Sequence, residues 1–309
     1  ESFYSQHPGA VLSTSINKYI YISSHNFFDE NQIRLKYSQT ETVKSVDEIE
    51  HRIMKQVLKK FDIHGAIEIS SNGDVPSGTG LGSSSSFTVG LLHNLYARSG
   101  KFVSKQVLAE DACDIEIIRL QEPIGKQDQY AAAYGGLNIF RFLSNGSVEV
   151  EPLYLRREVF ETLEENLLMF YYGQQRATSS ILSEQKGNME KKDKIATLKE
   201  MVSLVPDLRD ALYSGRLNDF GKILHENWLL KTSLASRITD DGIDQVYQAA
   251  LTAGAIGGKL LGAGGGGFFL FYCEKQNHSR LREALKQLRE MPFRFDNEGT
   301  KVIYYGSEE

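Results

Sequence analysis

The spacing of apolar and polar positions predicts a sheet with one helix at the start of the chain. β-Branched and aromatic residues gather in short runs that predict strands over residues 10–15, 18–23, 32–37 and 66–71. Before the last of these runs, apolar residues at helical spacing predict a helix over residues 46–61, with Asp47 as its candidate N-cap.

Further along the chain, the same spacing predicts two helices and a hairpin. One helix ends near Arg98, and a second covers residues 104–119, where the apolar side chains share one face. Strands follow over residues 137–140 and 148–155. The Asn145-Gly146 pair between them is a strong signal for a β-hairpin.

The second half of the chain combines strands with a long helical stretch. After a predicted linker over residues 156–165, the pattern predicts a buried strand over 167–172, mostly helical structure over about 177–251, a strand over 268–273, a helix near 280–289 and a last strand over 301–305. Strands and grouped helices in this order are typical of an α+β fold. We expect two domains, over residues 1–160 and 161–309.

Composition narrows the classes of partner. The chain has 309 residues and a net charge of -5, so no general electrostatic attraction to nucleic acid or to an anionic membrane is expected. Its longest apolar runs have the length of a strand and are too short to span a bilayer. The cysteines, Cys113 and Cys273, lie far apart and outside any metal-binding spacing, which argues against a disulfide framework or a zinc site. We therefore expect a cytoplasmic protein that acts on a small molecule.

Residues 76–86 read Pro-Ser-Gly-Thr-Gly-Leu-Gly-Ser-Ser-Ser-Ser, and an amphipathic helix follows at once. Glycines allow tight turns with bare N–H groups, and a helix that starts among the serines directs unpaired donors at an anion, so this segment predicts a phosphate site. A flexible linker is the alternative, but linkers lack such an attached helix. The segment has no Gly-Lys-Ser/Thr and no Gly-x-Ser-x-Gly, which argues against a P-loop NTPase and a serine-hydrolase elbow.

A second glycine cluster, residues 262–267, fits the dinucleotide pattern G-x-G-x-x-G only formally. That fingerprint needs a helix after it, whereas an apolar strand is predicted here. Two interpretations stay open. The cluster is either a bulged hairpin connection or a backbone packed closely against a ligand or against the first glycine segment.

A third group joins Glu116 with residues 123–130, which read Pro-Ile-Gly-Lys-Gln-Asp-Gln-Tyr. Taken alone, Asp128 is best explained as a cap for the alanine-rich segment that follows. Its occurrence between the two glycine clusters favours a role in chemistry instead.

Together, the three segments resemble the GHMP small-molecule kinases, the superfamily of galactokinase, homoserine kinase, mevalonate kinase and phosphomevalonate kinase. Residues 76–86 match that superfamily's second motif and residues 259–268 its third. The segments 9–19, 125–136 and 176–182 most resemble the D-glycero-D-manno-heptose 7-phosphate kinases. The resemblance implies a two-domain fold, with an N-terminal domain like domain 2 of ribosomal protein S5 and a ferredoxin-like C-terminal domain. The superfamily's first motif, a strand with a glycine-rich turn that grips the sugar, is expected before Glu1.

The resemblance also implies roles for individual residues. The ATP phosphates would be held by Pro76, Gly78, Gly80, Leu81, Gly82, Ser83, Ser84, Ser85 and Ser86. Ser84 and Glu116 match the Mg2+ ligands, and Asp128 matches the catalytic aspartate. Lys126 is expected to stabilise the transferred charge or to bind a sugar phosphate, with an exposed lysine as the alternative. The candidate substrate-binding residues are Lys18, Arg176, Gly264 and Gly265. For Lys18, a solvated charge on a strand edge is the alternative.

The leading hypothesis is an ATP-dependent kinase of the anomeric hydroxyl of D-glycero-D-manno-heptose 7-phosphate, which gives the 1,7-bisphosphate. The alternatives are another sugar 1-kinase of galactokinase or fucokinase type, a sugar and nucleotide sensor without transfer activity and, least favoured, a nicotinamide oxidoreductase. The expected partner is a sugar phosphate, not a nucleic acid or a membrane. Monomer and homodimer both stay open.

Overall fold

The computed structural model describes residues 3–173, 192–235 and 238–306. The chain divides into two units, each assembled from separate segments. Unit 1 contains residues 1–14, 78–81 and 137–295, and unit 2 contains residues 15–77, 82–136 and 296–309. The chain therefore passes from unit 1 to unit 2 between Leu81 and Gly82, within the first glycine segment.

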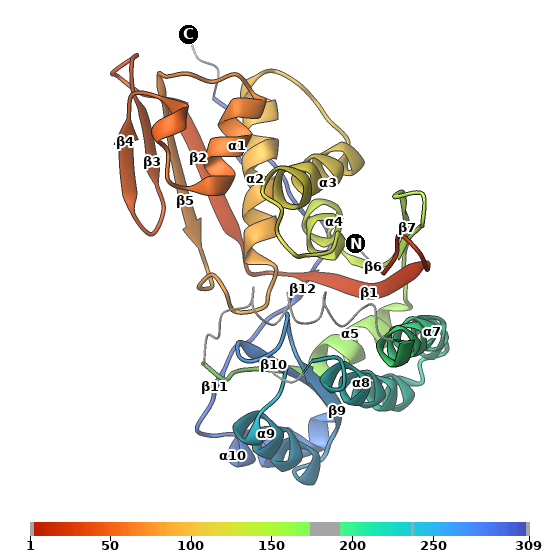
Figure 1. Ribbon diagram of the computed structural model, residues 1–309. Coiled ribbons are helices and arrows are strands. Elements are labelled where there is room, and N and C mark those ends of the chain that lie inside the picture. The colour runs from red at the N-terminus through yellow and green to blue at the C-terminus, as the bar shows by residue number, and fades with distance from the viewer. Residues whose placement is uncertain (1–2, 174–191, 236–237, 307–309) are drawn as a thin grey trace. The chain divides into compact units, whose positions relative to one another are not determined.

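Unit 2 is built on a four-stranded sheet with the order β2-β5-β3-β4. Its strands are β2 (Ile20–Asn26), β3 (Ile33–Lys36), β4 (Thr40–Val43) and β5 (Ile67–Gly73). β3 runs parallel to β5, and the other pairs are antiparallel. Helices α1 (Arg52–Lys60) and α2 (Ser83–Arg98) cover one face, where the alternating side chains of β3 and β5 are buried (Figure 1). Three of these strands are confirmed from the sequence, whereas the short β4 was not predicted.

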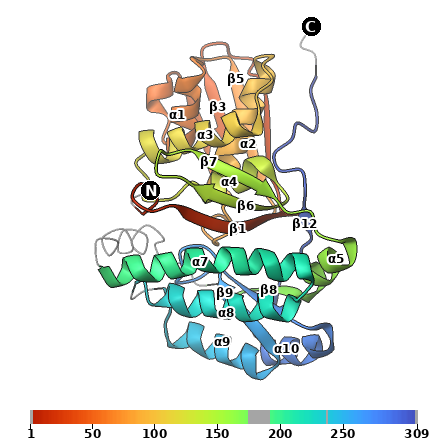
Figure 2. The same ribbon diagram turned by 90° about the vertical axis from the view of Figure 1, so that its right-hand side faces the viewer.

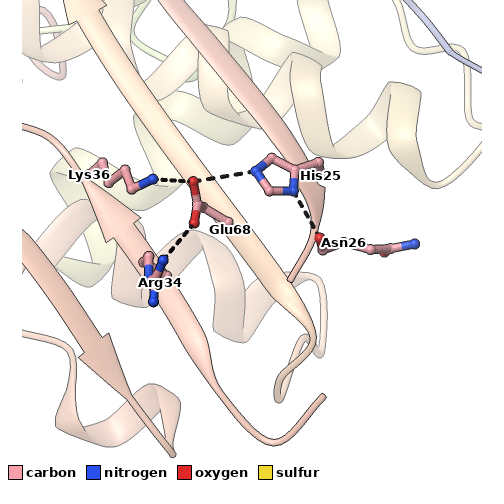
Figure 3. Close-up of polar contacts among 5 residues, drawn as sticks. All are labelled: His25, Asn26, Arg34, Lys36 and Glu68. Carbon is pink, nitrogen blue, oxygen red and sulfur yellow. Dashed lines mark hydrogen bonds and ion pairs between the residues drawn. The ribbon is translucent and has the colours of Figure 1, made fainter. Parts of the chain in front are cut away.

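The uncovered face of this sheet carries charged side chains around Glu68 (Figure 3). Lys36 donates to Oε1 of Glu68 at 2.5 Å, and His25 lies 3.3 Å from the same oxygen. Arg34 lies 3.5 Å from Oε2 and stacks over Phe27. The hydrogen bond from Lys36 is the main cause that lowers the pKa of Glu68. The longer basic side chains cover the carboxylate, so the Glu68 side chain is only 8% exposed on an open face.

The remaining helices of unit 2 differ in detail from the predicted ones. The region 46–61 contains a 3-10 turn, Val46–Glu48, and then α1, with Ser45 and His51 as their N-caps, so the assignment of Asp47 as a cap was wrong. Each cap lies directly before its own helical turn, and the chain is extended at Ile49 between them. The region 104–119 forms α3 (Lys105–Cys113) followed by a π-helix, Asp114–Arg119. The last helix of the unit is α4 (Gln127–Tyr134).

The end of the chain lies along α4. The backbone N–H of Gly136 donates to the carbonyl of Asp296 at 2.7 Å, and that of Thr300 donates to the carbonyl of Ala132 at 3.0 Å. The predicted strand over residues 301–305 was wrong. Despite their β propensity, these residues pair with no strand among the described residues, and the apolar side chains stay exposed at Val302, Ile303, Tyr304 and Tyr305.

Most residues of the two other sheets belong to unit 1. The first has the order β12-β1-β6-β7, from β1 (Gly9–Ile16), β6 (Leu137–Phe142), β7 (Val148–Pro152) and the short β12 (Phe295–Asp296). The predicted hairpin is confirmed, because β6 and β7 pair antiparallel across the Asn145-Gly146 turn. The side chain of Asn145 accepts a hydrogen bond from the N–H of Ser147, and Gly146 has a φ of 86°, which glycine adopts without strain.

The second sheet of unit 1 is antiparallel, with the order β11-β8-β10-β9. Its strands are β8 (Leu167–Tyr171), β9 (Ala255–Leu260), β10 (Phe268–Cys273) and β11 (Arg289–Glu290). The helices of the unit are α5 (Arg157–Asn166), α7 (Lys192–Ser214), α8 (Leu217–Thr232), α9 (Asp241–Thr252) and α10 (His278–Ala284), with a 3-10 turn at Lys275–Asn277. Side chains of α8, α9 and α10 form one core with this sheet, and α5, α7 and α8 contribute to a second (Figure 2).

The linker predicted over residues 156–165 was wrong, because this segment is helix α5. Val159 and Leu163, four residues apart, are buried in the second core. Glutamates surround these two positions, so the segment appeared polar enough for a linker. The expected helix near 280–289 ends earlier, at Ala284.

No helix in the described ranges is long and apolar enough to cross a membrane. Both cysteines, Cys113 and Cys273, are buried, and neither forms a disulfide.

Candidate active site

The first glycine segment turns through three left-handed positions. Gly78, Gly80 and Gly82 have φ values of 76°, 82° and 68°, which other residues adopt only at a cost. Gly82 is also the N-cap of α2 and has no side chain to satisfy the helix donors. The first intrahelical bond runs from the N–H of Ser86 to the carbonyl of Gly82. The N–H groups of the three preceding serines therefore find no acceptor within the helix.

The first turn of α2 contains no acidic residue, so nothing on the helix opposes the binding of an anion at its positive end. Ser83, Ser84, Ser85 and Ser86 all belong to α2, as the sequence predicted. The hydroxyls of Ser84 and Ser85 both point to one carboxylate, that of Glu116, at 2.6 and 2.9 Å.

Glu116 lies in the π-helix Asp114–Arg119 and is completely buried. A π-helical turn is rare and is found mostly at functional sites. Burial raises the pKa of Glu116, while the hydrogen bonds from Ser84, Gln129 and Ser85 act in the opposite direction, and the charge of Asp128 raises it further. A cation beside this carboxylate would relieve the cost of keeping it ionised.

Gln129 completes the surroundings of Glu116 and was not predicted from the sequence. Its Nε2 donates to Oε2 of Glu116 at 2.7 Å, and the residue is fully buried. The same carboxamide then presents Oε1, a buried acceptor with no hydrogen-bond partner in the described part of the chain. The only sequence signal was its place next to Asp128.

Hydroxyl, carboxylate and amide oxygens are the ligands that Mg2+ prefers, so the residues around Glu116 fit this ion. Ser84 and Glu116 would hold it, as the sequence predicted. No group of three His, Cys, Asp or Glu side chains in the described residues is suited to a metal. Mg2+ commonly takes few protein ligands and completes its shell with phosphate and water oxygens.

Asp128 lies at the start of α4, where it is exposed, and it faces the start of α2. A Cβ atom added to Gly82 would lie 3.5 Å from Cβ and Cγ of Asp128 and 3.7 Å from its Oδ2. The N-cap of α4 is Lys126, so Asp128 is not the cap. Lys126 itself is half-buried. The start of α2, two carboxylates and a lysine are thus brought together within unit 2.

A cavity of about 250 Å³ opens beside Ser84 and Glu116. Its other lining residues are His51, Arg52, Ile53, Leu120 and Glu122, all of unit 2. This cavity could not be predicted from the sequence, because its walls come from three separate segments of the chain.

In unit 1, the second glycine cluster packs against the first glycine segment. A Cβ atom added to Gly262 would lie 2.5 Å from Cα of Gly80, and one added to Gly267 would lie 2.2 Å from the carbonyl oxygen of Thr79. The cluster also connects the antiparallel strands β9 and β10. The hairpin connection and the packing against the first glycine segment are therefore both present, and contact with a ligand stays a prediction. As expected, a strand and not a helix follows the cluster, so it does not form a dinucleotide fingerprint.

The candidate substrate residues have different outcomes. Gly264 and Gly265 pack against Ile238 of unit 1, to which the N–H of Gly265 donates a hydrogen bond at 3.0 Å. Lys18 lies in the connection between β1 and β2, not on a strand edge. Arg176 lies outside the described residues. The role of each in substrate binding stays a prediction.

Comparison with known proteins agrees with this arrangement. The family model of the GHMP kinases N terminal domain matches residues 43–136, and that of the GHMP kinases C terminal domain matches residues 208–291. Together, they span more than half of the chain. The chain belongs to the GHMP kinase family. GHMP kinases are phosphotransferases that use ATP, so the two-domain α+β fold and the kinase activity expected from the sequence are confirmed.

The expected resemblance to heptose kinases is confirmed as well. The chain is 29% identical over 258 residues to D-glycero-alpha-D-manno-heptose 7-phosphate kinase of Campylobacter jejuni, with 82% of this chain and 74% of that protein covered. It is 26% identical to the galactokinase of Pyrococcus furiosus over 93% of this chain and 89% of that protein. The crystal structure of a D-glycero-D-manno-heptose 1-phosphate kinase from Bacteroides thetaiotaomicron has the same fold, with a TM-score of 0.76, 24% identity and coverage of 97% of this chain and 92% of that one.

Proposed function

We propose that this GHMP kinase transfers the γ-phosphoryl group of ATP to the anomeric hydroxyl of D-glycero-D-manno-heptose 7-phosphate or a close sugar phosphate, with Mg2+ as cofactor. The identity with the Campylobacter enzyme supports the heptose substrate. The observation that carries the proposal is the position of Asp128 against Gly82, where α2 presents its free N–H groups. An anion held by those groups would have a carboxylate beside it.

In the proposed reaction, the anomeric oxygen attacks the γ-phosphorus, and the bond from that phosphorus to the bridging oxygen of ADP breaks. The proton of the hydroxyl passes to the carboxylate of Asp128, which acts as the general base. The serine N–H groups hold the phosphates, and Lys126 balances negative charge on the transferred group. Phosphoryl transfer needs mainly this alignment and charge neutralisation.

When bound, Mg2+ would neutralise negative charge on the phosphates. Ser84 and Glu116 would hold it, and Gln129 would keep the carboxylate of Glu116 in place. The cavity of about 250 Å³ is lined by Ser84 and Glu116, and we assign the nucleoside to it.

Product analysis of the full chain with ATP, with and without Mg2+, tests the proposal. We expect transfer to heptose 7-phosphate and none to mevalonate. Asp128→Asn should lower kcat by about a hundredfold or more, as expected when a general base is lost. Asp241→Asn is the matched control, because Asp241 is also an exposed residue in the first turn of a helix, α9, and should leave kcat unchanged.

Equal turnover of galactose with none of the heptose phosphate would favour the galactokinase-type alternative. Full activity of Asp128→Asn would exclude the assigned base.

A further inference from the structure

Lys231 is a buried lysine whose ammonium group holds two backbone carbonyls of the second glycine cluster and the strand before it. It lies at the end of α8 and is only 9% exposed. Its Nζ donates to the carbonyl of Gly262 at 2.6 Å and to that of Leu260 at 3.1 Å. Trp228, one turn earlier, places its ring centroid 5.9 Å from the same atom. Lysine is rarely buried to this degree, because the ammonium needs partners that replace water.

The two carbonyls belong to the residues on either side of Leu261, whose backbone packs against Gly80. Leu260 ends β9, and Gly262 starts the glycine cluster, with Leu261 between them. A Cβ atom added to Gly80 would lie 2.7 Å from the carbonyl oxygen of Leu261. All of these contacts lie within unit 1.

Gly80 itself has a φ of 82° and no side chain, so its conformation depends on the backbone packed against it. Among the described residues, few other hydrogen bonds hold the turn at residues 260–262 in place. The N–H of Leu261 donates to the carbonyl of Phe268 at 2.8 Å, but the carbonyls of Leu260 and Gly262 are held by Lys231. Charge-assisted hydrogen bonds of this kind are about twice as strong as neutral ones.

We propose that Lys231 is a positioning residue for nucleotide binding. It holds the turn at residues 260–262 in place, and this turn holds the conformation of Gly80 in the proposed phosphate-binding segment. This inference rests on the proposed function, in which residues 78–86 hold the ATP phosphates. Lys231 need not touch the nucleotide. Its loss should therefore weaken nucleotide binding and leave binding of the sugar phosphate almost unchanged.

Isothermal titration calorimetry of the full chain with a non-hydrolysable ATP analogue, and separately with heptose 7-phosphate, tests the inference. Lys231→Met keeps the length and the apolar stem but removes the charge and the donors. We expect its Kd for the analogue to rise by about tenfold, the loss expected for one or two hydrogen bonds to a charged group. The KM for ATP should rise more than kcat falls. Lys222→Met, on the exposed side of the same helix, is the matched control and should bind as the unchanged chain does.

A double variant separates positioning from a general structural effect. Gly262→Ala displaces the same turn, because its added Cβ would overlap Gly80. If Lys231 acts through the turn, Lys231→Met should weaken nucleotide binding far less in the Gly262→Ala background than in the unchanged chain. Additive effects would overturn the inference. Should Lys231→Met fail to fold, Lys231→Gln, which keeps one donor group, replaces it: a Kd for the analogue above that of the unchanged chain would support the role, and an unchanged Kd would overturn it.

The two proposals can fail separately. If the unchanged chain does not bind the analogue, the proposed function and this inference both fall. If it binds and Lys231→Met binds equally well, only the inference falls.

Discussion

Glu116 is the residue in which burial and charge oppose each other most directly. Its carboxylate is fully buried and is held by Ser84, Ser85 and Gln129. Burial raises its pKa, so without a cation the protonated form is more favoured in the folded protein than in the unfolded chain. The raised pKa of Glu116 in the folded state stabilises the folded protein at low pH. This contribution to stability is lost as the pH rises through the raised pKa.

Replacing Glu116 with glutamine should therefore have opposite effects on stability and on function. In Mg2+-free buffer, the free energy of unfolding of Glu116→Gln should rise relative to that of the unchanged chain between acidic and neutral pH. The same variant should bind the Mg2+ complex of the ATP analogue more than about tenfold more weakly, as expected for the loss of a metal ligand. Urea unfolding at several pH values and calorimetry measure the two effects.

Glu110→Gln is the control, because Glu110 is an exposed residue of α3. Equal pH dependence of Glu116→Gln and the unchanged chain would contradict the account of Glu116.

At this scale, the sequence predicted most of the residues that gather in unit 2. Gly82 and the serines were predicted from their motif, and Glu116 and Asp128 from the resemblance to the GHMP kinases. Gln129 and Lys231 were missed, because a buried glutamine or lysine in a helix is recognised only by what packs around it. No residue spacing predicts that Lys231 reaches the carbonyls of a turn distant in sequence.

Among the elements, α2 has a positive dipole end at its N-terminus and no side-chain cap there. Gly82 provides no side-chain cap, and the first turn carries only serines. A negative side chain at this end would stabilise the helix by about 0.3–1 kcal/mol. It would also occupy the donors that the proposed function assigns to the phosphates.

Ser83→Asp should therefore raise the unfolding midpoint slightly and weaken binding of the ATP analogue by at least about tenfold, because a like charge faces the phosphates. Thermal unfolding and calorimetry measure the two changes. Ser104→Asp adds the same charge at the N-cap of α3, where Ser104 already accepts a hydrogen bond from the N–H of Val107. That control should not change nucleotide binding, and a similar loss there would disprove the local explanation.

The elements that the sequence did not predict share a physical cause. β4, β11 and β12 are two to four residues long, too short for a clear period of alternation. The π-helix that holds Glu116 follows α3 without a break, so its apolar positions fit the spacing of one long helix. A strand needs a neighbour, and the segment 301–305 has β propensity without one in the described structure.

At the scale of the whole molecule, this segment leaves consecutive apolar side chains exposed. Ile303 and Tyr304 are 73% and 84% exposed, and Val302 and Tyr305 flank them. Exposed apolar residues with β propensity favour pairing with another chain. We expect the chain of 309 residues to associate reversibly as its concentration rises.

Replacing Ile303 and Tyr304 together with aspartate should reduce this association and leave the unfolding midpoint unchanged, because neither side chain is buried. Sedimentation velocity over a range of concentrations measures the effect. Phe102→Asp is the control, since Phe102 is 96% exposed but stands outside this segment. Association that persists in the double variant would place the contact elsewhere on the chain.

Residues 296–300 also determine when α4 acquires its final contacts. Residues 296–300 bond to the end of the helix that begins with Gln127 and Asp128, and Lys105 joins both by donating to the carbonyls of Tyr134 and Glu298. During synthesis on a ribosome, these residues emerge after all the others of unit 2 that contribute to the candidate active site. The helix of Asp128 therefore gains this support only after residue 300 has emerged, and a nascent chain that stalls earlier would hold the proposed base without it.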